Sequence, residues 1–179
     1  MSQAIAEGDG ISVLVEVADG SEAAAAELQG ADALAVARGA IDLGDGSQLP
    51  VLLLENPGET AGVTADAVVV APDAEAWDRA QGLGIDCVVR VAAADDLGRA
   101  LEELDPEVFL LSTEPDSEKD ALESLLALLH DVPAGKLAIA ELRDASADDV
   151  AELERAGVDA VLVTSRDVAA LVPAEPPEV

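Results

Sequence analysis

Aromatic and basic side chains are nearly missing from this chain. It holds one Trp, one Phe and no Tyr, and its 38 acidic residues face only 9 basic ones, for a formal net charge of −29. Binding of nucleic acid relies on clustered Lys and Arg and on aromatic stacking, so this composition excludes a nucleic-acid partner. No apolar run approaches the roughly 18 residues needed to span a bilayer, and we therefore expect no membrane partner either.

Cysteine and histidine occur once each, as Cys87 and His130. A lone cysteine forms no internal disulfide, and the N-terminus lacks a basic start followed by an apolar stretch, so we expect a cytoplasmic protein. Neither residue has a partner at metal-ligand spacing, and the sequence predicts no metal and no cofactor. We expect Cys87 to be a small core residue, His130 to end a helix and Trp77 to pack a helix against a sheet.

The acidity itself has two interpretations. Abundant Asp and Glu with only two lysines, Lys119 and Lys136, fit adaptation to high salt, because salt screens self-repulsion. The alternative is a source proteome that is generally acidic and Ala-rich, combined with selection for solubility. Neither interpretation indicates a reaction or a ligand.

Short β-branched runs alternate along the chain with Ala- and Leu-rich segments. We expect strands at Ser12–Val17, Ala33–Ala37, Pro50–Leu54, Ala67–Ala71, Asp86–Val91, Val108–Ser112, Leu137–Glu141 and Ala160–Thr164, and helices at Ser21–Leu28, Ala74–Leu83, Asp95–Leu104, Ser117–His130 and Ser146–Ala156. Apolar runs that do not alternate indicate strands buried on both faces, as in a parallel sheet covered by helices. The pattern predicts an α/β protein, a minimal (βα)8 barrel, with an open flavodoxin-like sheet as the alternative.

The helix-capping residues of the last βαβ unit support this prediction. Ser146 precedes an acidic first turn, as a helix N-cap does, and Gly157 stands where a left-handed C-cap would end the helix. Two connections, 38–49 and 55–66, are too short for full helices and are expected to hold vestigial ones. We assign residues 1–172 to a single barrel domain and 173–179 to a flexible, Pro- and Glu-rich tail.

Several short sequence segments, in collinear order, resemble the indole-3-glycerol-phosphate synthase family of tryptophan biosynthesis. Those segments include Gly30-Ala31-Asp32-Ala33, Leu49-Pro50-Val51-Leu52, Ala65-Asp66-Ala67-Val68, Leu83-Gly84-Ile85-Asp86 and Gly157-Val158-Asp159-Ala160. The resemblance implies a (βα)8 barrel and a lyase that closes an indole ring from an anilino-deoxyribulose phosphate, losing carbon dioxide and water. It covers nearly the whole chain.

At the family's functional positions the chain departs from the pattern. Glu16 and Glu141 match two family glutamates, but the two family lysines are replaced by Ala18 and Leu54. Arg90 replaces the fifth-strand glutamate, Ser112 begins the counterpart of an Asn-Asn-Arg motif, and Thr164 stands where a phosphate-binding glycine is expected. Ring closure needs a proton donor poised near neutral pH, and a phosphate needs cations or backbone amides. The resemblance therefore implies the fold more strongly than the activity.

The alignment places Glu16, Leu54, Arg90 and Glu141 in one layer at the mouth of the barrel, since barrel interiors fill in layers of four from alternate strands. We hypothesise that Arg90 bridges Glu16 and Glu141 in place of the lost lysine. This network either binds a small polar ligand or only closes the barrel.

The sequence thus predicts a barrel that resembles the synthase but lacks its activity. The alternatives are a weakly active or altered lyase and a non-catalytic binding or regulatory module. The candidate catalytic residues are Glu16, Glu141 and Arg90, and the candidate substrate-binding residues are Ser21 and Ser112. A small-molecule ligand at the barrel mouth is the expected partner, and the oligomeric state is left open.

Overall fold

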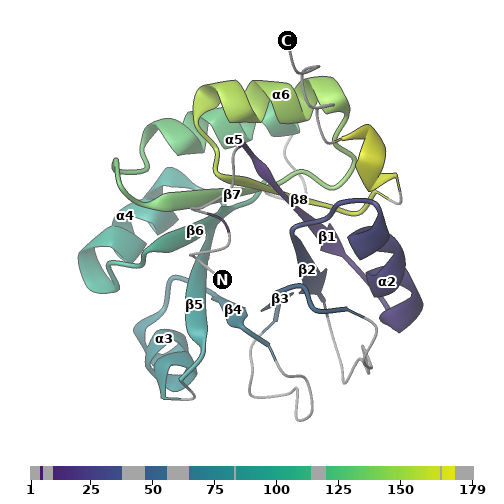
Figure 1. Ribbon diagram of the computed structural model, residues 1–179. Helices are drawn as coiled ribbons and strands as arrows, with labels where there is room; N and C mark the ends of the chain where they lie inside the picture. The colour runs from purple at the N-terminus through teal and green to yellow at the C-terminus, as the bar shows by residue number, and fades with distance from the viewer. Residues whose placement is uncertain are drawn as a thin grey trace.

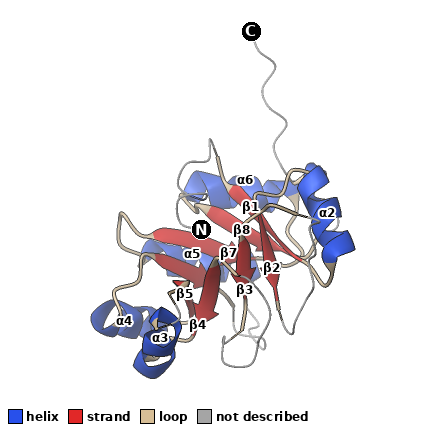
Figure 2. Cartoon of the chain, turned by 60° about the horizontal axis from the view of Figure 1, so that its bottom comes forward, coloured by secondary structure: helices blue, strands red, loops and turns tan. Residues whose placement is uncertain are grey.

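Eight parallel strands close into a barrel in the order of the sequence. The computed structural model describes residues 5, 10–37, 47–55, 65–82, 84–113, 120–165 and 167–171. Figure 1 shows the strands as a ring with helices outside it, and Figure 2 shows the same arrangement from another side. The strands are β1 (Ser12–Glu16), β2 (Ala33–Val36), β3 (Val51–Leu53), β4 (Ala67–Val70), β5 (Asp86–Val91), β6 (Val108–Leu111), β7 (Leu137–Glu141) and β8 (Ala160–Val163).

The closed ring confirms the predicted (βα)8 fold over the open-sheet alternative. Leu14 of β1 pairs with Ala33 of β2 on one side and with Leu162 of β8 on the other. The register of inward-facing residues steps by two at each even-numbered strand, so it advances by eight around the ring, the shear typical of this fold. All eight predicted strands are present, with ends that differ by one residue at most.

Helices cover the outside of the ring after most strands. They are α2 (Gly20–Leu28), α3 (Ala74–Gln81), α4 (Ala94–Glu103), α5 (Ala121–His130) and α6 (Ala147–Ala156), with a short 3-10 helix, η3 (Val168–Ala170), after β8. Each of α2, α4, α5 and α6 buries two residues three positions apart, for example Leu125 and Leu128 of α5. That spacing puts one apolar stripe against the outward face of the strands.

The helix ends follow the local sequence. The Ser146 side chain accepts a hydrogen bond from the Asp149 amide, the Asp149 carboxylate accepts one from the Ser146 amide, and Gly157 ends the helix at φ 94°. Both predicted caps of α6 are therefore confirmed. Asp120 caps α5, so that helix begins at Ala121 rather than at Ser117. The predicted vestigial helices and the tail fall largely on residues 38–46, 56–64 and 172–179, which lie outside the described residues.

Apolar side chains fill the inside of the ring. Leu14, Leu52, Val88 and Ile139, one from each odd-numbered strand, are at most 2% exposed and form the middle layer. Small residues of the even-numbered strands, such as Ala35 and Ala67, fit between them. The next layer toward the C-terminal ends of the strands contains the candidate site.

Candidate functional site

The mouth layer consists of Glu16, Leu54, Arg90 and Glu141, each two residues beyond a member of the middle layer. Successive residues of a strand point to opposite faces, so a step of two keeps a side chain inside the barrel. Leu54 is buried in the interior cluster, and the side chain of Glu141 is only 10% exposed. The predicted layer is therefore present at the end where barrel enzymes hold their active sites.

The ion pairs of this layer differ from the predicted ones in one respect. The Nη2 atom of Arg90 lies 3.4 Å from Oε2 of Glu141, as expected, but the cation beside Glu16 is Arg143. Its Nη1 atom lies 3.5 Å from Oε2 of Glu16, and its Nη2 atom lies 3.1 Å from Oε1 of Glu141. Among the described residues, Arg143 and not Arg90 joins the two glutamates.

Arg143 can reach both carboxylates because of its place in the chain. It lies two residues beyond the end of β7, in the turn that leads to α6, and its backbone carbonyl accepts hydrogen bonds from the Thr164 amide and hydroxyl, each 2.9 Å long. These bonds fix the turn next to the end of β8. Nε and Nη2 of Arg143 then both donate to Oε1 of Glu141. Within this network, two guanidinium groups face two carboxylates.

Two polar atoms of the mouth are buried without a hydrogen-bond partner in the described structure. They are Oε2 of Glu16 and Nε of Arg90. The contact between Glu16 and Arg143 is thus electrostatic, because 3.5 Å between Oε2 and Nη1 is too long for a good hydrogen bond. A buried polar atom without a partner is costly, so the ion-pair network leaves one acceptor and one donor unsatisfied.

Two cavities flank the mouth. One of about 440 Å³ lies between β1, α2 and the segment after β8, and its lining includes Glu16 and Ser21. The other, of about 410 Å³, lies at the C-terminal ends of β3, β4 and β5, and its lining includes Leu54 and Arg90. Both lie within the size range of small-molecule sites.

The two candidate substrate-binding serines lie in different surroundings. Ser21 is exposed in the first turn of α2 and shares the first cavity with Glu16. Ser112, just after β6, is 7% exposed, and its hydroxyl donates to the Val91 carbonyl at 3.4 Å. The structure does not bring the two serines to one place, and their binding role stays a prediction.

At the N-terminus of α2, backbone amides donate hydrogen bonds to carboxylates of the chain itself. Asp19 accepts hydrogen bonds from the amides of Ser21 (2.8 Å) and Glu22 (3.0 Å), and Glu22 accepts one from the amide of Ala18 (2.8 Å). Free amides at a helix start attract phosphate, but here carboxylates already occupy them. Sequence reasoning missed both Arg143 and this arrangement, although the Asp19-x-x-Glu22 spacing is a known capping signal.

The lone cysteine and histidine lie away from the mouth. Burial, and to a smaller extent the neighbouring Asp86 carboxylate, raises the pKa of the Cys87 thiol above its ordinary value of 9.0. A protonated thiol is a poor nucleophile, which agrees with a packing role. His130 is the last residue of α5, as predicted. Over the described ranges, no group of three or more His, Cys, Asp and Glu side chains is placed to hold a metal ion. None of the helices in the described part is long and apolar enough to cross a membrane.

Comparison with known sequences supports the resemblance in part. No protein-family model matches the chain. The indole-3-glycerol phosphate synthase of Variovorax paradoxus (strain S110) is 33% identical over 124 residues, which cover 65% of this chain and 47% of that enzyme. The chain thus spans about half the length of the curated relative that it matches.

Solved structures share the fold at low sequence identity. Thiamine phosphate pyrophosphorylase from Pyrococcus furiosus has a TM-score of 0.69 at 14% identity, with 90% of this chain and 93% of that one covered. The N-acetylmannosamine-6-phosphate 2-epimerase from Clostridium perfringens has a TM-score of 0.65 at 15% identity, with 90% and 88% covered. Identities this low establish the architecture alone. The chain is a TIM-barrel protein with a partial sequence likeness to indole-3-glycerol phosphate synthase.

Proposed function

We propose that this chain is a synthase-like barrel whose mouth is closed by ion pairs and which does not catalyse indole-ring closure. One observation carries the proposal: Arg90 and Arg143 lie against Glu16 and Glu141, the two carboxylates that match family positions. Glu141 contacts both guanidinium groups and Glu16 contacts that of Arg143, so both carboxylates are already engaged in ion pairs within the protein. The two glutamates serve here to hold the mouth together.

The missing proton donors support the same conclusion. Leu54 stands where the family has its general-acid lysine, and its side chain is buried among apolar residues of the barrel interior. Ala18 stands at the other lysine position and carries no donor on its side chain. Loss of one transition-state donor costs about two to three orders of magnitude in rate, so several losses together bring turnover close to background.

The anionic substrate of the family would also find little to hold it. The amides at the start of α2 bond to Asp19 and Glu22, and Thr164 replaces the glycine expected for phosphate. The hydroxyl of Thr164 donates instead to the carbonyl of Arg143. A phosphate placed here would meet carboxylates rather than free donors.

A second candidate is an altered lyase or a non-catalytic binding module that takes a different small molecule at the mouth. The cavities of about 440 and 410 Å³ at the C-terminal ends of the strands favour it.

Turnover of the anilino-deoxyribulose phosphate separates these candidates. The purified chain and an authentic synthase are compared at low and high salt by chromatography of indole-3-glycerol phosphate, with circular dichroism to confirm folding. We expect no product above background from the folded chain. Product at even a thousandth of the authentic rate would contradict the proposal and favour an altered lyase. If product is absent, saturable binding at the mouth of a compound other than this substrate would favour the binding module.

A further inference from the structure

A separate cavity lies at the opposite, N-terminal end of the barrel. It measures about 490 Å³ and lies beneath β4, β5 and β6. Its origin is a stagger between strands: β5 pairs with β4 from Asp86 onward, but its first partner in β6 is Val108, opposite Val88. Pro106 precedes β6 and has no amide hydrogen to extend the pairing. The first two residues of β5 therefore face a gap.

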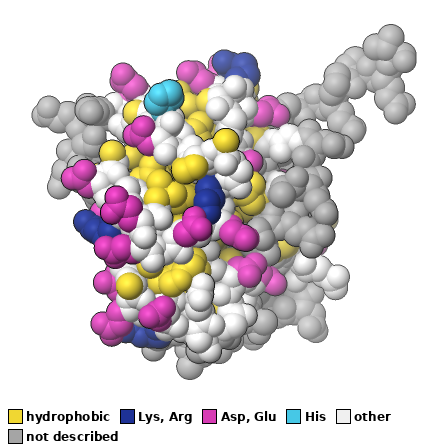
Figure 3. Space-filling view, turned by 90° about the vertical axis from the view of Figure 1, so that its left-hand side faces the viewer, with side chains coloured by type: hydrophobic (Ala, Val, Ile, Leu, Met, Phe, Trp, Pro, Cys, Tyr) yellow, Lys and Arg dark blue, Asp and Glu magenta, His cyan; other side chains and the backbone are white. Residues whose placement is uncertain are grey.

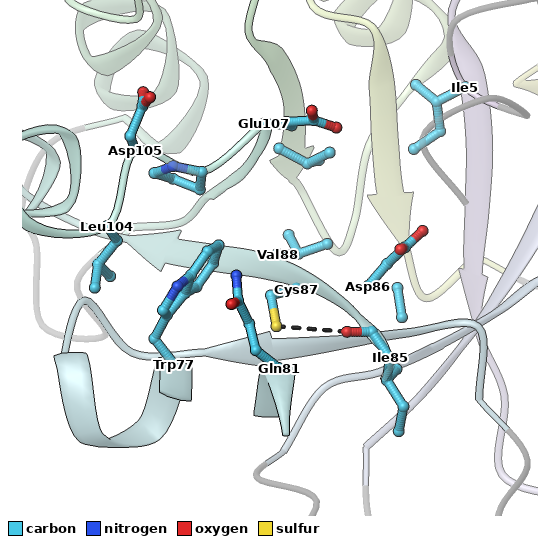
Figure 4. Close-up of a pocket in the computed structure, with 13 residues that line it drawn as sticks. Ile5, Trp77, Gln81, Ile85, Asp86, Cys87, Val88, Leu104, Asp105 and Glu107 are labelled. Carbon is cyan, nitrogen blue, oxygen red and sulfur yellow. Dashed lines mark hydrogen bonds between the residues drawn. The ribbon is translucent and has the colours of Figure 1, made fainter. Parts of the chain in front are cut away.

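One wall of the cavity is apolar and includes the chain's single tryptophan. Trp77 and Gln81 project from α3 toward Cys87, and Val88 and Leu104 continue the wall (Figure 4). The Trp77 side chain is half-buried against the outer core, so its ring is held by packing and partly open to the cavity. A fixed, partly exposed indole ring is a good surface for a flat apolar group or an organic cation.

The rim of the same cavity is acidic. Asp86, Asp105 and Glu107 contribute carboxylates, and Figure 4 shows Glu107 across the cavity from Trp77. Asp105 is neutralised by Lys136, whose Nζ lies 2.6 Å from Oδ1. Glu107 is exposed and makes no ion pair with any residue of the described part. Figure 3 shows one face of the molecule on which acidic side chains lie beside apolar ones, with a few basic side chains among them.

We propose that this cavity binds a small organic cation whose flat body stacks on Trp77 while its charged group lies beside Glu107. The volume of the cavity lies within the range of small-molecule sites. The carboxylates alone would form only a solvated acidic edge. The aromatic wall and the gap in strand pairing make the enclosed space that a ligand needs. This site is independent of the barrel mouth and does not rest on the function proposed for it.

Benzylammonium chloride is a suitable probe, with benzyl alcohol as its neutral counterpart of similar size. Trp77 is the only tryptophan and the chain has no tyrosine, so intrinsic fluorescence reports on this wall alone. We expect a saturable fluorescence change with benzylammonium at fixed ionic strength, and binding at least tenfold weaker for benzyl alcohol. Bound benzylammonium should also slow the alkylation of Cys87, the only thiol, by N-ethylmaleimide.

Two variants of equal charge test the position of the site. Glu107→Gln is expected to weaken benzylammonium binding about threefold to fivefold. Glu152→Gln, on the exposed face of α6, removes the same charge far from the cavity and should leave binding within twofold of the parent. Equal binding of the amine and the alcohol, equal effects of the two variants, or no saturable binding would each overturn the proposal.

Discussion

Arg90 is one of the two arginines that form an ion pair with Glu141 at the mouth. Its partner Glu141 has a side chain only 10% exposed, while Arg90 itself is 36% exposed. Removing one partner of a mostly buried pair leaves the other charge poorly solvated. Arg143 also contacts Glu141, but its side chain is 56% exposed and it is shared with Glu16, so it only partly compensates.

We therefore expect Arg90→Met to lower the free energy of unfolding by about 2 kcal/mol near neutral pH. Urea unfolding followed by circular dichroism gives the change. Arg79→Met is the matched control, because Arg79 forms an exposed pair with Glu75 one turn away in α3 and should cost about 0.5 kcal/mol or less. If the two variants lose the same stability, the mouth pair is no stronger than a surface pair.

An aspartate recurs just before three of the strands, and the sequence shows its position but not its hydrogen bond. Asp32, Asp66 and Asp159 each precede a strand, and each carboxylate accepts a hydrogen bond of 2.7–2.8 Å from an amide of the preceding strand. The three sequence segments around them contribute to the family resemblance. Their physical role, joining neighbouring strands at the N-terminal face, appears only when the register is known. The Ala-Asp-Ala and Val-Asp-Ala repeats were the available signal.

At the scale of secondary-structure elements, strands and helix ends were the most predictable features. The apolar runs set the strands because both of their faces are buried, and Ser146 and Gly157 set the ends of α6 through local hydrogen bonds. The role of Arg143 could not be predicted in the same way. It lies in a turn beyond β7, and its direction depends on the contact between that turn and Thr164, 21 residues further along the chain.

The capping box of α6 leads to a prediction for pH. Hydrogen bonds from the Ser146 hydroxyl and amide hold the pKa of Asp149 below its ordinary value of 3.8. A lowered pKa means that the folded state binds fewer protons than the unfolded state. The stabilisation is therefore complete above pH 3.8 and is lost as the pH falls through the lower, folded-state value.

Asp149→Asn should therefore cost about 1 kcal/mol at pH 7, and this difference from the parent should shrink as the pH falls below 3.8. Urea unfolding curves across that range measure it. Asp148→Asn is the control, because Asp148 lies in the same first turn but outside the capping box, and should cost only a few tenths of a kcal/mol. A loss for Asp149→Asn that persists unchanged in acid would rule out the carboxylate as its source.

At the scale of the whole molecule, charge is distributed unevenly between surface and mouth. The chain has 38 acidic and 9 basic residues, yet in the described part Arg90 and Arg143 both form ion pairs with carboxylates at the mouth. The mouth pairs are partly buried, whereas most other carboxylates of the described residues are exposed and repel one another. Salt screens exposed charges much more than buried ones, so its net effect on folding is set by the surface.

We accordingly expect potassium chloride to stabilise the fold. Raising it from about 0.1 M to about 1 M shortens the screening length from about 10 Å to about 3 Å, which removes most repulsion between exposed carboxylates. The free energy of unfolding should rise by about 1 kcal/mol or more over this range and change little at higher concentration, because screening is then nearly complete. Urea unfolding at stepped salt concentrations measures the curve. A steady linear rise without a plateau would point to exclusion of salt from the protein surface, and a fall would mean that the ion pairs, the mouth network included, outweigh the self-repulsion of a chain with a net charge of −29.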